Sequence, residues 1–344
     1  MEGSGPYFDV VISSRVRLAR NLADYPFPSR ISSETMEEIV DKVEAAVKGA
    51  SVDPRVGALE VIRLNRLSPV ERQVMVEKHL ISPQFAGAGG VGRAVALGNE
   101  EVVSVMINEE DHLRIQVFLP GMQLHEAWNI ADAVDDFFEQ KLVYAFDEVL
   151  GYLTCCPTNV GTGLRASVML HLPGLALTGQ TEEVLGVLSR VGLAVRGLFG
   201  EGTQSLGNIF QVSNQITLGR TEKEIISNLS SVTKKLIEQE RSAREALIQG
   251  EGKLKLEDRV FRSYGILSNA RTMSSKEALS LLSDLKLGID LKIIKDIEPR
   301  IFNELIVLIQ PGFIQHIIGR ELEAEERDRI RADIIREVMA RKEQ

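Results

Sequence analysis

The chain has 344 residues, 44% of them hydrophobic, so it can form one large domain with a smaller one, or two medium domains. A net charge of −9, from 40 basic and 49 acidic residues, argues against general binding to nucleic acid or to an anionic membrane. No apolar run reaches the roughly 20 residues of a membrane span, and the first residues lack a signal-peptide pattern, so we expect a cytoplasmic protein without a membrane segment.

The first two-thirds of the chain predicts a mixture of helices and strands. Apolar residues recur at helical spacing from Met36 to Val47, after Ser32 and Ser33, which can cap that helix. A helix is also expected at 123–142, and strands are expected at 102–107, 113–119, 151–156, 166–172, 194–199 and 208–213. Because the strands follow one another without a regular βαβ alternation, the pattern favours a mostly antiparallel or mixed sheet.

The remaining third predicts helices only. Thr221-x-x-Glu224 forms a capping box that begins a long helix, which we expect to end near Gly250. Ser274-x-x-Glu277 begins another helix, Pro311-Gly312 interrupts a later one, and the last twenty residues resemble a charged helix. We therefore predict an α+β domain over 9–242 and an all-helical domain over 255–344.

Two further features have simple interpretations. Cys155 and Cys156 are adjacent, and neighbouring Cα atoms lie about 3.8 Å apart, which is shorter than a relaxed disulfide prefers. We expect both to be free thiols in a reducing compartment. The glycines at 87, 89, 90 and 92 lack the Lys-Ser/Thr of a P-loop, so they predict a loop or hairpin rather than a phosphate cradle.

Arginines are the candidate anion ligands. They occur in polar segments, which we expect to be strand ends and turns, at Arg15, Arg17, Arg114, Arg165 and Arg196. The planar guanidinium binds phosphate through two parallel hydrogen bonds, so a cluster of arginines would suit a polyphosphate. Taken singly, each arginine is more simply interpreted as a solvated surface charge.

Acidic side chains and a thiol are the complementary candidates. A guanidinium has a pKa above about 12 and is a poor nucleophile until it is oriented or loses a proton. Glu110 in NEEDH and Glu201 in FGEGT could hold a guanidinium and accept that proton, and a thiolate at Cys156 would add a negative partner. Taken singly, Glu110 is more simply a turn residue and Cys156 a small core residue.

Four segments together resemble the signature segments of the phosphagen (guanidino) kinases. They are SSRVRLARN at 13–21, NEEDHLR at 108–114, CPTNVGTGLRAS at 156–167 and RGLFGE at 196–201. They occur in the order that the family has, and the similarity covers about 9–242. The resemblance implies the family's α+β fold, in which helices flank a mostly antiparallel sheet, and transfer of a phosphoryl group from ATP to a guanidinium nitrogen.

The resemblance also implies roles for individual residues. Glu110 and Glu201 would hold the guanidinium and supply the base, and Cys156 would be the active-site thiol. Mg²⁺ would be held mainly by the ATP phosphates and water, without a protein ligand. The residues implied for nucleotide binding are Ser13, Ser14, Arg15, Val16, Arg17, His79, Arg114, Arg165, Ala166, Ser167, Val168, Met169, Arg196, Gly197, Leu198, Phe199, Gly200 and Glu201. Met169 stands where metabolite-directed members commonly have histidine.

The arrangement of the chain resembles the bacterial protein arginine kinases within this family. Metabolite-directed members carry a helical domain before the SSRVR segment, whereas only twelve residues precede Ser13 here and the additional helices follow the catalytic region. The resemblance implies phosphorylation of arginine in proteins, marking them for Clp-type degradation during stress. The implied partners are proteins with exposed or unfolded arginines, a zinc-containing activator, a Clp-type ATPase and protease, a heat-shock repressor and a second copy of the chain.

The C-terminal segment contains one further match. Residues 327–332 fit the RDxxRA element with which this kinase type binds phosphoarginine at an allosteric site, which implies roles for Arg327, Asp328, Arg331 and Ala332. Arg327 and Arg331 are four residues apart and share a helix face. Two alternatives to a protein arginine kinase remain open: a kinase for free arginine or another small guanidino compound, and a catalytically silent phosphoarginine-binding adaptor.

Overall fold

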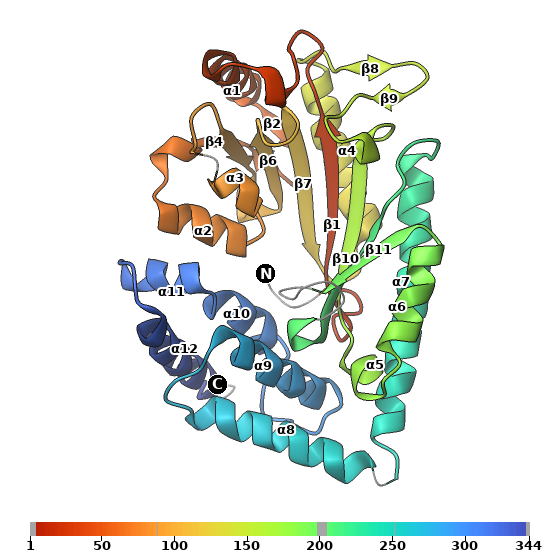
Figure 1. Ribbon diagram of the computed structural model, residues 1–344, viewed down its shortest axis with the longest axis vertical. Helices are drawn as coiled ribbons and strands as arrows, with labels where there is room; N and C mark the ends of the chain where they lie inside the picture. Colours follow the sequence, from red (N-terminus) through yellow and green to blue (C-terminus); the bar gives the residue numbers. More distant parts are fainter. Residues whose placement is uncertain (1–4, 88, 198–204, 251, 342–344) are drawn as a thin grey trace.

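The computed structural model describes residues 5–87, 89–197, 205–250 and 252–341. An eight-stranded sheet lies at its centre, and each pair of neighbouring strands is antiparallel, as predicted (Figure 1). In order across the sheet, the strands are β11 (Leu193–Gly197), β12 (Ile209–Asn214), β10 (Leu164–His171), β1 (Val11–Arg20), β7 (Leu113–Pro120), β6 (Val103–Ile107), β5 (Ala94–Leu97) and β4 (Glu60–Arg63).

Strand β1 occupies the middle of the sheet and has a different character on each face. Successive side chains of a strand point to opposite faces, so Val16 and Leu18 enter the hydrophobic core while Arg15 and Arg17 lie on the other face. The sequence analysis had placed these arginines at strand ends and in turns. That expectation is wrong, because β1 is a ten-residue strand that pairs with β7 and β10 on its two sides.

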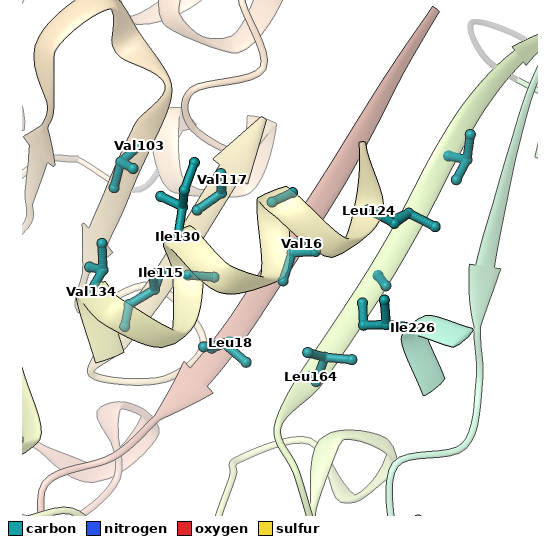
Figure 2. Packing of buried hydrophobic residues seen from close by; sticks show 14 of the residues in the cluster. Val16, Leu18, Val103, Ile115, Val117, Leu124, Ile130, Val134, Leu164 and Ile226 are labelled. Atoms are coloured by element: carbon teal, nitrogen blue, oxygen red, sulfur yellow. The ribbon is translucent and has the colours of Figure 1, made fainter. Parts of the chain in front are cut away.

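Two helices cover the apolar face of the sheet. They are α4 (Leu124–Glu139) and α7 (Glu222–Leu247), whose buried residues join the same core cluster as the strands. Figure 2 shows Ile130 and Val134 of α4 above the sheet residues Val16, Ile115 and Val117. Each fully buried aliphatic side chain of this kind contributes about 1.5–3 kcal/mol, so the face opposite the arginines anchors the sheet.

The remaining elements of the first 200 residues surround this sheet. The helices are α1 (Ser33–Val47), α2 (Pro69–Glu77), α3 (Pro83–Gly87), α5 (Pro173–Leu177) and α6 (Thr181–Arg190). Short strands form two hairpins, β2 (Ser51–Asp53) with β3 (Gly57–Ala58) and β8 (Phe146–Asp147) with β9 (Gly151–Tyr152). Single 3-10 turns occur at Pro28–Arg30, Leu64–Arg66, Asn99–Glu101, Pro157–Asn159 and Leu206–Asn208.

The C-terminal part of the chain is helical. Its helices are α8 (Gly252–Asn269), α9 (Ser275–Asp290), α10 (Ile301–Leu308), α11 (Pro311–Ile318) and α12 (Ala324–Met339). Helices α8, α9, α10 and α12 share a second hydrophobic cluster, to which the sheet contributes Ile12 and Ile209. Among the described residues no strand follows β12, as predicted. No single helix in the described ranges is long and apolar enough to cross a membrane. Helices α10 and α11 together have the length and composition of a broken span, with a bend of 77° between them.

The predicted helix starts are confirmed, and one predicted strand is wrong. The Thr221 side chain accepts from the backbone N–H of Glu224 in a complete capping box, and Ser274 accepts from the N–H of Glu277. The expected strand at 151–156 is reduced to the two residues of β9. It stops early because the N–H of Cys155 donates to the Asp111 carboxylate (2.7 Å) instead of to a neighbouring strand.

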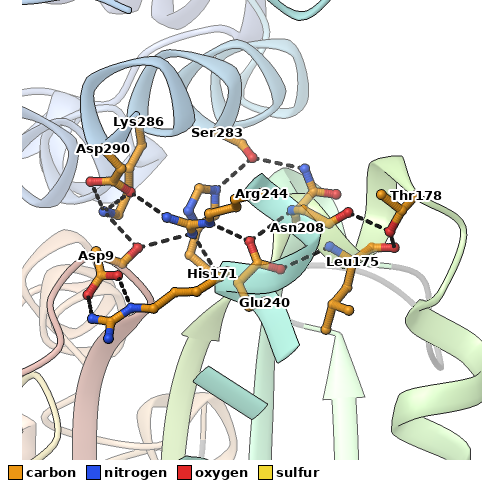
Figure 3. Close-up of polar contacts among 12 residues, drawn as sticks. Asp9, His171, Leu175, Thr178, Asn208, Glu240, Arg244, Ser283, Lys286 and Asp290 are labelled. Atoms are coloured by element: carbon orange, nitrogen blue, oxygen red, sulfur yellow. Dashed lines mark hydrogen bonds and ion pairs between the residues drawn. The ribbon is translucent and has the colours of Figure 1, made fainter. Parts of the chain in front are cut away.

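A buried polar network joins the helical part to the sheet (Figure 3). Its centre is Arg244 of α7, which donates to Glu240 Oε1 (2.5 Å), Asp290 Oδ2 (3.1 Å) and the backbone carbonyls of Asp9 and His171. Lys286 of α9 also donates to Asp290 (2.9 Å). Ion pairs and hydrogen bonds to backbone carbonyls therefore hold α7 and α9 to the segment before β1 and to the end of β10.

Candidate active site

A cavity of about 750 Å³ opens on the polar face of the sheet. It receives side chains from β1, β7, β10, β11 and β12, and from the loop between β9 and β10. The five arginines singled out in the sequence all line it, together with Glu110 and Cys156; these are Arg15, Arg17, Arg114, Arg165 and Arg196. Segments far apart in the chain thus bring the candidate groups to one place.

The strand register explains this convergence. Arg17 pairs with Arg165 across β1 and β10, and Arg15 pairs with Ser167 two residues away on the same face. Arg196 of β11 is opposite Gln211 of β12, whose side-chain oxygen accepts from Arg15 (2.8 Å). Because every second residue faces the cavity, an R-x-R spacing on β1 delivers two guanidinium groups to the same site.

The arginine cluster carries little compensating negative charge. Among the described residues, Arg114 is the only one of the five with an ion pair, to Glu109 (2.7 Å). Nε of Arg17 is buried and has no hydrogen-bond partner in the ranges that the structure describes. Burial, and then the neighbouring Arg114, lowers the pKa of Arg15 to about 10. Burial and three other arginines hold the pKa of Arg17 well below its usual value, which is the electrostatic signature of a site built for a polyanion.

Among the described residues, Glu110 and its neighbour Asp111 are the carboxylates that line the cavity. Burial is the first cause that raises the pKa of Glu110, and the charges of Asp111 and Glu109 add to the rise, while Arg114 and Arg165 oppose it. A carboxylate with a raised pKa binds a proton more readily, which suits a general base. Its neighbour Glu109 does not line the cavity and accepts hydrogen bonds from Ser82 (2.7 Å) and Arg114.

The two cysteines occupy different environments. Cys156 lines the cavity, and its Sγ lies 3.0 Å from the Thr158 hydroxyl. Cys155 lies against Asp111, and burial followed by that carboxylate raises the pKa of the Cys155 thiol to about 12. Both are free thiols, as expected. Of the two, Cys156 is placed to meet a molecule in the cavity.

His79 lies beside the cavity rather than in its wall. Its ring stacks on Phe118 with centroids 6.0 Å apart, and its backbone carbonyl accepts from Gln116 (2.6 Å). The residue has a positive φ of 61°, which is uncommon for a side chain other than glycine. Burial, and then Arg15, lowers its pKa to about 4, so the ring is neutral next to the arginine cluster.

The other residues implied for nucleotide binding fall into distinct groups. Val16, Ala166 and Val168 lie on the helix-covered face and pack in the core. Ser14 fixes the start of α4, because its hydroxyl donates to the Gly121 carbonyl (2.8 Å) and accepts from the N–H of Gln123 (2.9 Å). Ser13 is buried, and Met169 packs against the C-terminal cluster.

The glycine-rich end of β11 is only partly described. Gly197 lines the cavity, and Ser167 lies within 3.4 Å of Arg15 Nε. Leu198, Phe199, Gly200 and Glu201 lie outside the described residues. The binding and catalytic roles of all of these residues therefore stay predictions.

Sequence reasoning overlooked residues that support the site from beneath. Arg20 is 1% exposed, pairs with Asp135 (2.6 Å) and donates to the Thr162 carbonyl (2.9 Å), and its guanidinium lies 3.5 Å from the centroid of the Tyr152 ring. Gly163 has a φ of +64°, and a Cβ there would come within 2.6 Å of the Ala19 carbonyl. The R-x-R-x-x-R spacing from 15 to 20 was visible, but burial of the third arginine was not.

The RDxxRA residues take part in the packing of the C-terminal helices. Arg331 is 1% exposed, and its guanidinium donates to the carbonyls of Ile309 (2.8 Å) and Met273 (2.9 Å) and pairs with Asp328. Arg327 donates to the Leu322 carbonyl (2.6 Å), and Ala332 is buried in the helical cluster. In this conformation both arginines are engaged by the protein's own backbone.

Comparisons with known proteins give the chain a family. Residues 38–243 match "ATP:guanido phosphotransferase, C-terminal catalytic domain", and residues 253–344 match "Protein-arginine kinase McsB C-terminal domain". The protein-arginine kinase of Moorella thermoacetica is 58% identical over 99% of this chain and 97% of its own. That of Brevibacillus brevis is 53% identical over 98% of this chain and 94% of its own.

Solved structures share the fold at lower identity. Lombricine kinase superposes with a TM-score of 0.59 at 24% identity, over 72% of this chain and 70% of its own. The substrate-free duplicated taurocyamine kinase from Schistosoma mansoni has a TM-score of 0.60 at 24% identity, over 92% of this chain and 48% of its own. The predicted fold class, a mostly antiparallel sheet flanked by helices and followed by a helical region, is confirmed.

Proposed function

Because this chain belongs to the protein-arginine kinase family of ATP:guanido phosphotransferases, we propose that it transfers the γ-phosphoryl group of ATP to arginine side chains in proteins. The observation that carries the proposal is the cavity in which five arginines meet Glu110 and Cys156. The buried Nε of Arg17, which has no partner within the described part of the chain, fits a phosphate oxygen as its acceptor. The family and this geometry together support an enzyme rather than a silent adaptor.

The chemistry follows from the charges in the cavity. The arginines hold the phosphates of ATP and stabilise the charge that spreads over the γ-phosphoryl oxygens during transfer. The acceptor guanidinium lies against Glu110, one of its nitrogens forms the N–P bond, and the bond between Pγ and the bridging oxygen of ADP breaks. Glu110 takes the proton that the nitrogen loses. The same role for Glu201 rests on the family resemblance.

Mg²⁺ would be held by the nucleotide. No group of three or more His, Cys, Asp or Glu side chains that could bind a metal occurs in the described ranges, and Mg²⁺ commonly binds through phosphate oxygens and water. When bound there, it neutralises part of the phosphate charge. The arginines and Glu110 would still provide the binding and the proton transfer described above.

The direct test is a phosphotransfer assay with two acceptors. Purified protein is incubated with ATP, Mg²⁺ and either unfolded casein or free arginine, and the products are analysed by mass spectrometry at neutral pH, since the N–P bond is acid-labile. We expect label on casein arginines, and its loss in Glu110→Ala. Glu126→Ala is the matched control, because Glu126 is an exposed carboxylate on α4 outside the cavity. Label on free arginine alone would assign the chain to small guanidino acceptors instead.

The finer cellular role is also a proposal. We propose that phosphorylation marks proteins for a Clp-type ATPase and protease in the stress response. We also propose that the enzyme works in the cytoplasm as a homodimer. Its proposed partners are a zinc-containing activator and a heat-shock repressor. Support comes from the similarity to protein-arginine kinases across nearly the whole chain. Co-purification of a catalytically inactive variant with these partners, compared with the wild type, tests it.

We further propose that residues 327–332 contribute to binding of phosphoarginine. Arg327 and Arg331 lie on one side of α12, which supports a shared site. Arg331 would have to exchange carbonyl partners for a phosphate. Calorimetric titration with phosphoarginine, for the wild type and Arg327→Ala, measures whether this segment binds it.

A further inference from the structure

We propose that Asp111 is a positioning residue, which holds Glu110 and the loop of Cys156 at the wall of the cavity and thereby sets where the acceptor guanidinium meets the γ-phosphoryl group. The inference rests on the proposed phosphotransfer and identifies how its acceptor side is built. Asp111 is 2% exposed, directly follows Glu110 in the turn at the wall of the cavity, and accepts a hydrogen bond from the loop that carries Cys156.

The contacts of Asp111 join two parts of the site. Its Oδ1 accepts from the backbone N–H of Cys155 (2.7 Å), one residue before the thiol in the cavity. The same oxygen accepts from Asn21 Nδ2 (2.6 Å), one residue beyond the end of β1. One carboxylate oxygen therefore fixes the Cys156 loop relative to the strand that carries Arg15 and Arg17.

Asn21 completes this connection from the other side. Its side-chain oxygen accepts from the backbone N–H of His112 (2.9 Å), directly after Asp111, and its Nδ2 also donates to the Leu153 carbonyl (3.1 Å). The turn that carries Glu110 is thus tied to β1 at two points. We refer to Asp111 and Asn21 together as the clamp.

The clamp determines the position of Glu110, against which the acceptor guanidinium lies, because Glu110 has few fixed contacts of its own. Glu110 is exposed to the cavity, and its backbone N–H donates to Glu109 (3.0 Å), which is itself held by Arg114. Asp111 is the residue that fixes the turn on the other side of Glu110. A shift of about 1 Å in a reacting group can reduce the rate by about two orders of magnitude.

The negative charge of Asp111 has a consequence beyond hydrogen bonding. An asparagine oxygen could accept the same two hydrogen bonds, and no basic side chain pairs with Asp111 within the described part of the chain. The charged groups that act on Glu110 are Asp111, Glu109, Arg114 and Arg165. Of these, the two carboxylates raise the pKa of Glu110 beyond the effect of burial, so Asp111 also increases its affinity for the proton.

These two effects can be separated with three variants. Asp111→Ala removes both hydrogen bonds and the charge, Asp111→Asn keeps the hydrogen bonds and removes the charge, and Asn21→Ala weakens the clamp and keeps the charge. The assay is phosphotransfer to casein between pH 5.5 and 9, with kcat and KM determined separately for ATP and for casein. Thermal unfolding of each variant checks that it is folded.

We expect Asp111→Ala to lower kcat about 100-fold, with KM for ATP changed by less than about threefold, because the arginines are not displaced. Asp111→Asn should recover kcat to within about tenfold of the wild type and move the acidic limb of the pH profile to lower pH. Asn21→Ala should lower kcat and leave that limb in place. Equal losses and unchanged pH profiles in both Asp111 variants would overturn the inference.

Hydrogen exchange does not depend on catalysis, so it tests the clamp separately from the proposed phosphotransfer. Hydrogen exchange of the Cys155 amide should be about tenfold or more faster in Asp111→Ala than in the wild type, and it should stay slow in Asp111→Asn. Exchange as slow in Asp111→Ala as in the wild type would refute the clamp. If the wild type transferred no phosphoryl group at all, the proposed function would fail, whereas the exchange result would still decide the clamp.

Discussion

At the scale of single residues, the arginine cluster favours anion binding and lowers the stability of the free protein. Arg17 lies near Arg15, Arg114 and Arg165, with Glu109 as the opposing charge, and its Nε has no hydrogen-bond partner among the described residues. Burying a charge among like charges costs free energy, and a bound anion would offset that cost. The same reasoning applies more weakly to Arg15, which has Gln211 as a partner.

We therefore predict that Arg17→Met raises the stability of the free protein and weakens ATP binding. Removing this charge should increase the free energy of unfolding by on the order of 1 kcal/mol, and the Kd for ATP should rise by at least about tenfold. Urea unfolding with and without ATP measures both effects. A variant that is less stable than the wild type, yet binds ATP normally, would contradict the prediction.

Arg331 provides a contrasting case, because the protein itself satisfies its donors. Arg331→Ala leaves the carbonyls of Ile309 and Met273 without this partner in a buried region, which should cost about 1–3 kcal/mol. Arg329→Ala is the control on the exposed side of the same helix and should change stability by less than about 0.5 kcal/mol. Urea denaturation curves for both variants test this, and equal stabilities would show that the carbonyl contacts contribute nothing.

At the scale of elements, the strand that carries the site is also the strand that organises the core. Val16 and Leu18 of β1 pack under α4, and the alternate positions carry Arg15 and Arg17. A one-residue slip of β1 would exchange the two faces. The apolar packing on one face therefore fixes the geometry of the binding face.

The contact between α7 and α9 depends on a buried ion-pair network. We predict that Lys286→Met destabilises the protein by about 3–5 kcal/mol, because it removes one of the two cations that compensate Asp290. Lys253→Met, on the exposed side of α8, is the control and should have little effect. The measurement is chemical denaturation monitored by circular dichroism, and a loss below about 1 kcal/mol would show that Arg244 alone suffices for Asp290.

At the scale of the whole molecule, three histidines couple folding to pH: His112 and His171, which are buried, and His79, which is half-buried. Burial, followed by Arg15 for His79, lowers the pKa of His79 and of His112 to about 4. Burial, with Lys286 and Arg244, lowers the pKa of His171 well below its usual value. Between pH 6.5 and 4 the unfolded chain binds protons on these rings and the folded protein does not, so the contribution of these three histidines to stability falls as the pH falls.

We predict that the free energy of unfolding decreases below pH 6.5, with each histidine adding up to about 1.4 kcal/mol per pH unit to the slope. His79→Gln should reduce the slope of the free energy of unfolding against pH by the contribution of one proton, up to about 1.4 kcal/mol per pH unit. Denaturation curves from pH 7.5 to 4.5 provide the comparison. A slope identical in the two proteins would show that His79 does not remain neutral in the fold.

The sequence by itself determined those features that depend on neighbours along the chain. The capping pairs at Thr221 and Ser274 predicted where α7 and α9 begin, because a side-chain oxygen satisfies backbone N–H groups only two or three residues away. The family resemblance rested on contiguous motifs and gave the class of the fold and of the reaction. It also named the five arginines and Glu110, which the structure brings to one cavity.

Only the tertiary structure decided which residues of those motifs face the site and which support it. Val16 and Ala166 stand inside the motifs yet pack in the core, while Asp111 and Asn21, 90 residues apart, meet at the wall of the site. The expected strand at 151–156 failed for the same reason, since the Cys155 amide bonds a distant carboxylate. Strand register, burial and long-range hydrogen bonds are relations between segments, and no local pattern in the sequence specifies them.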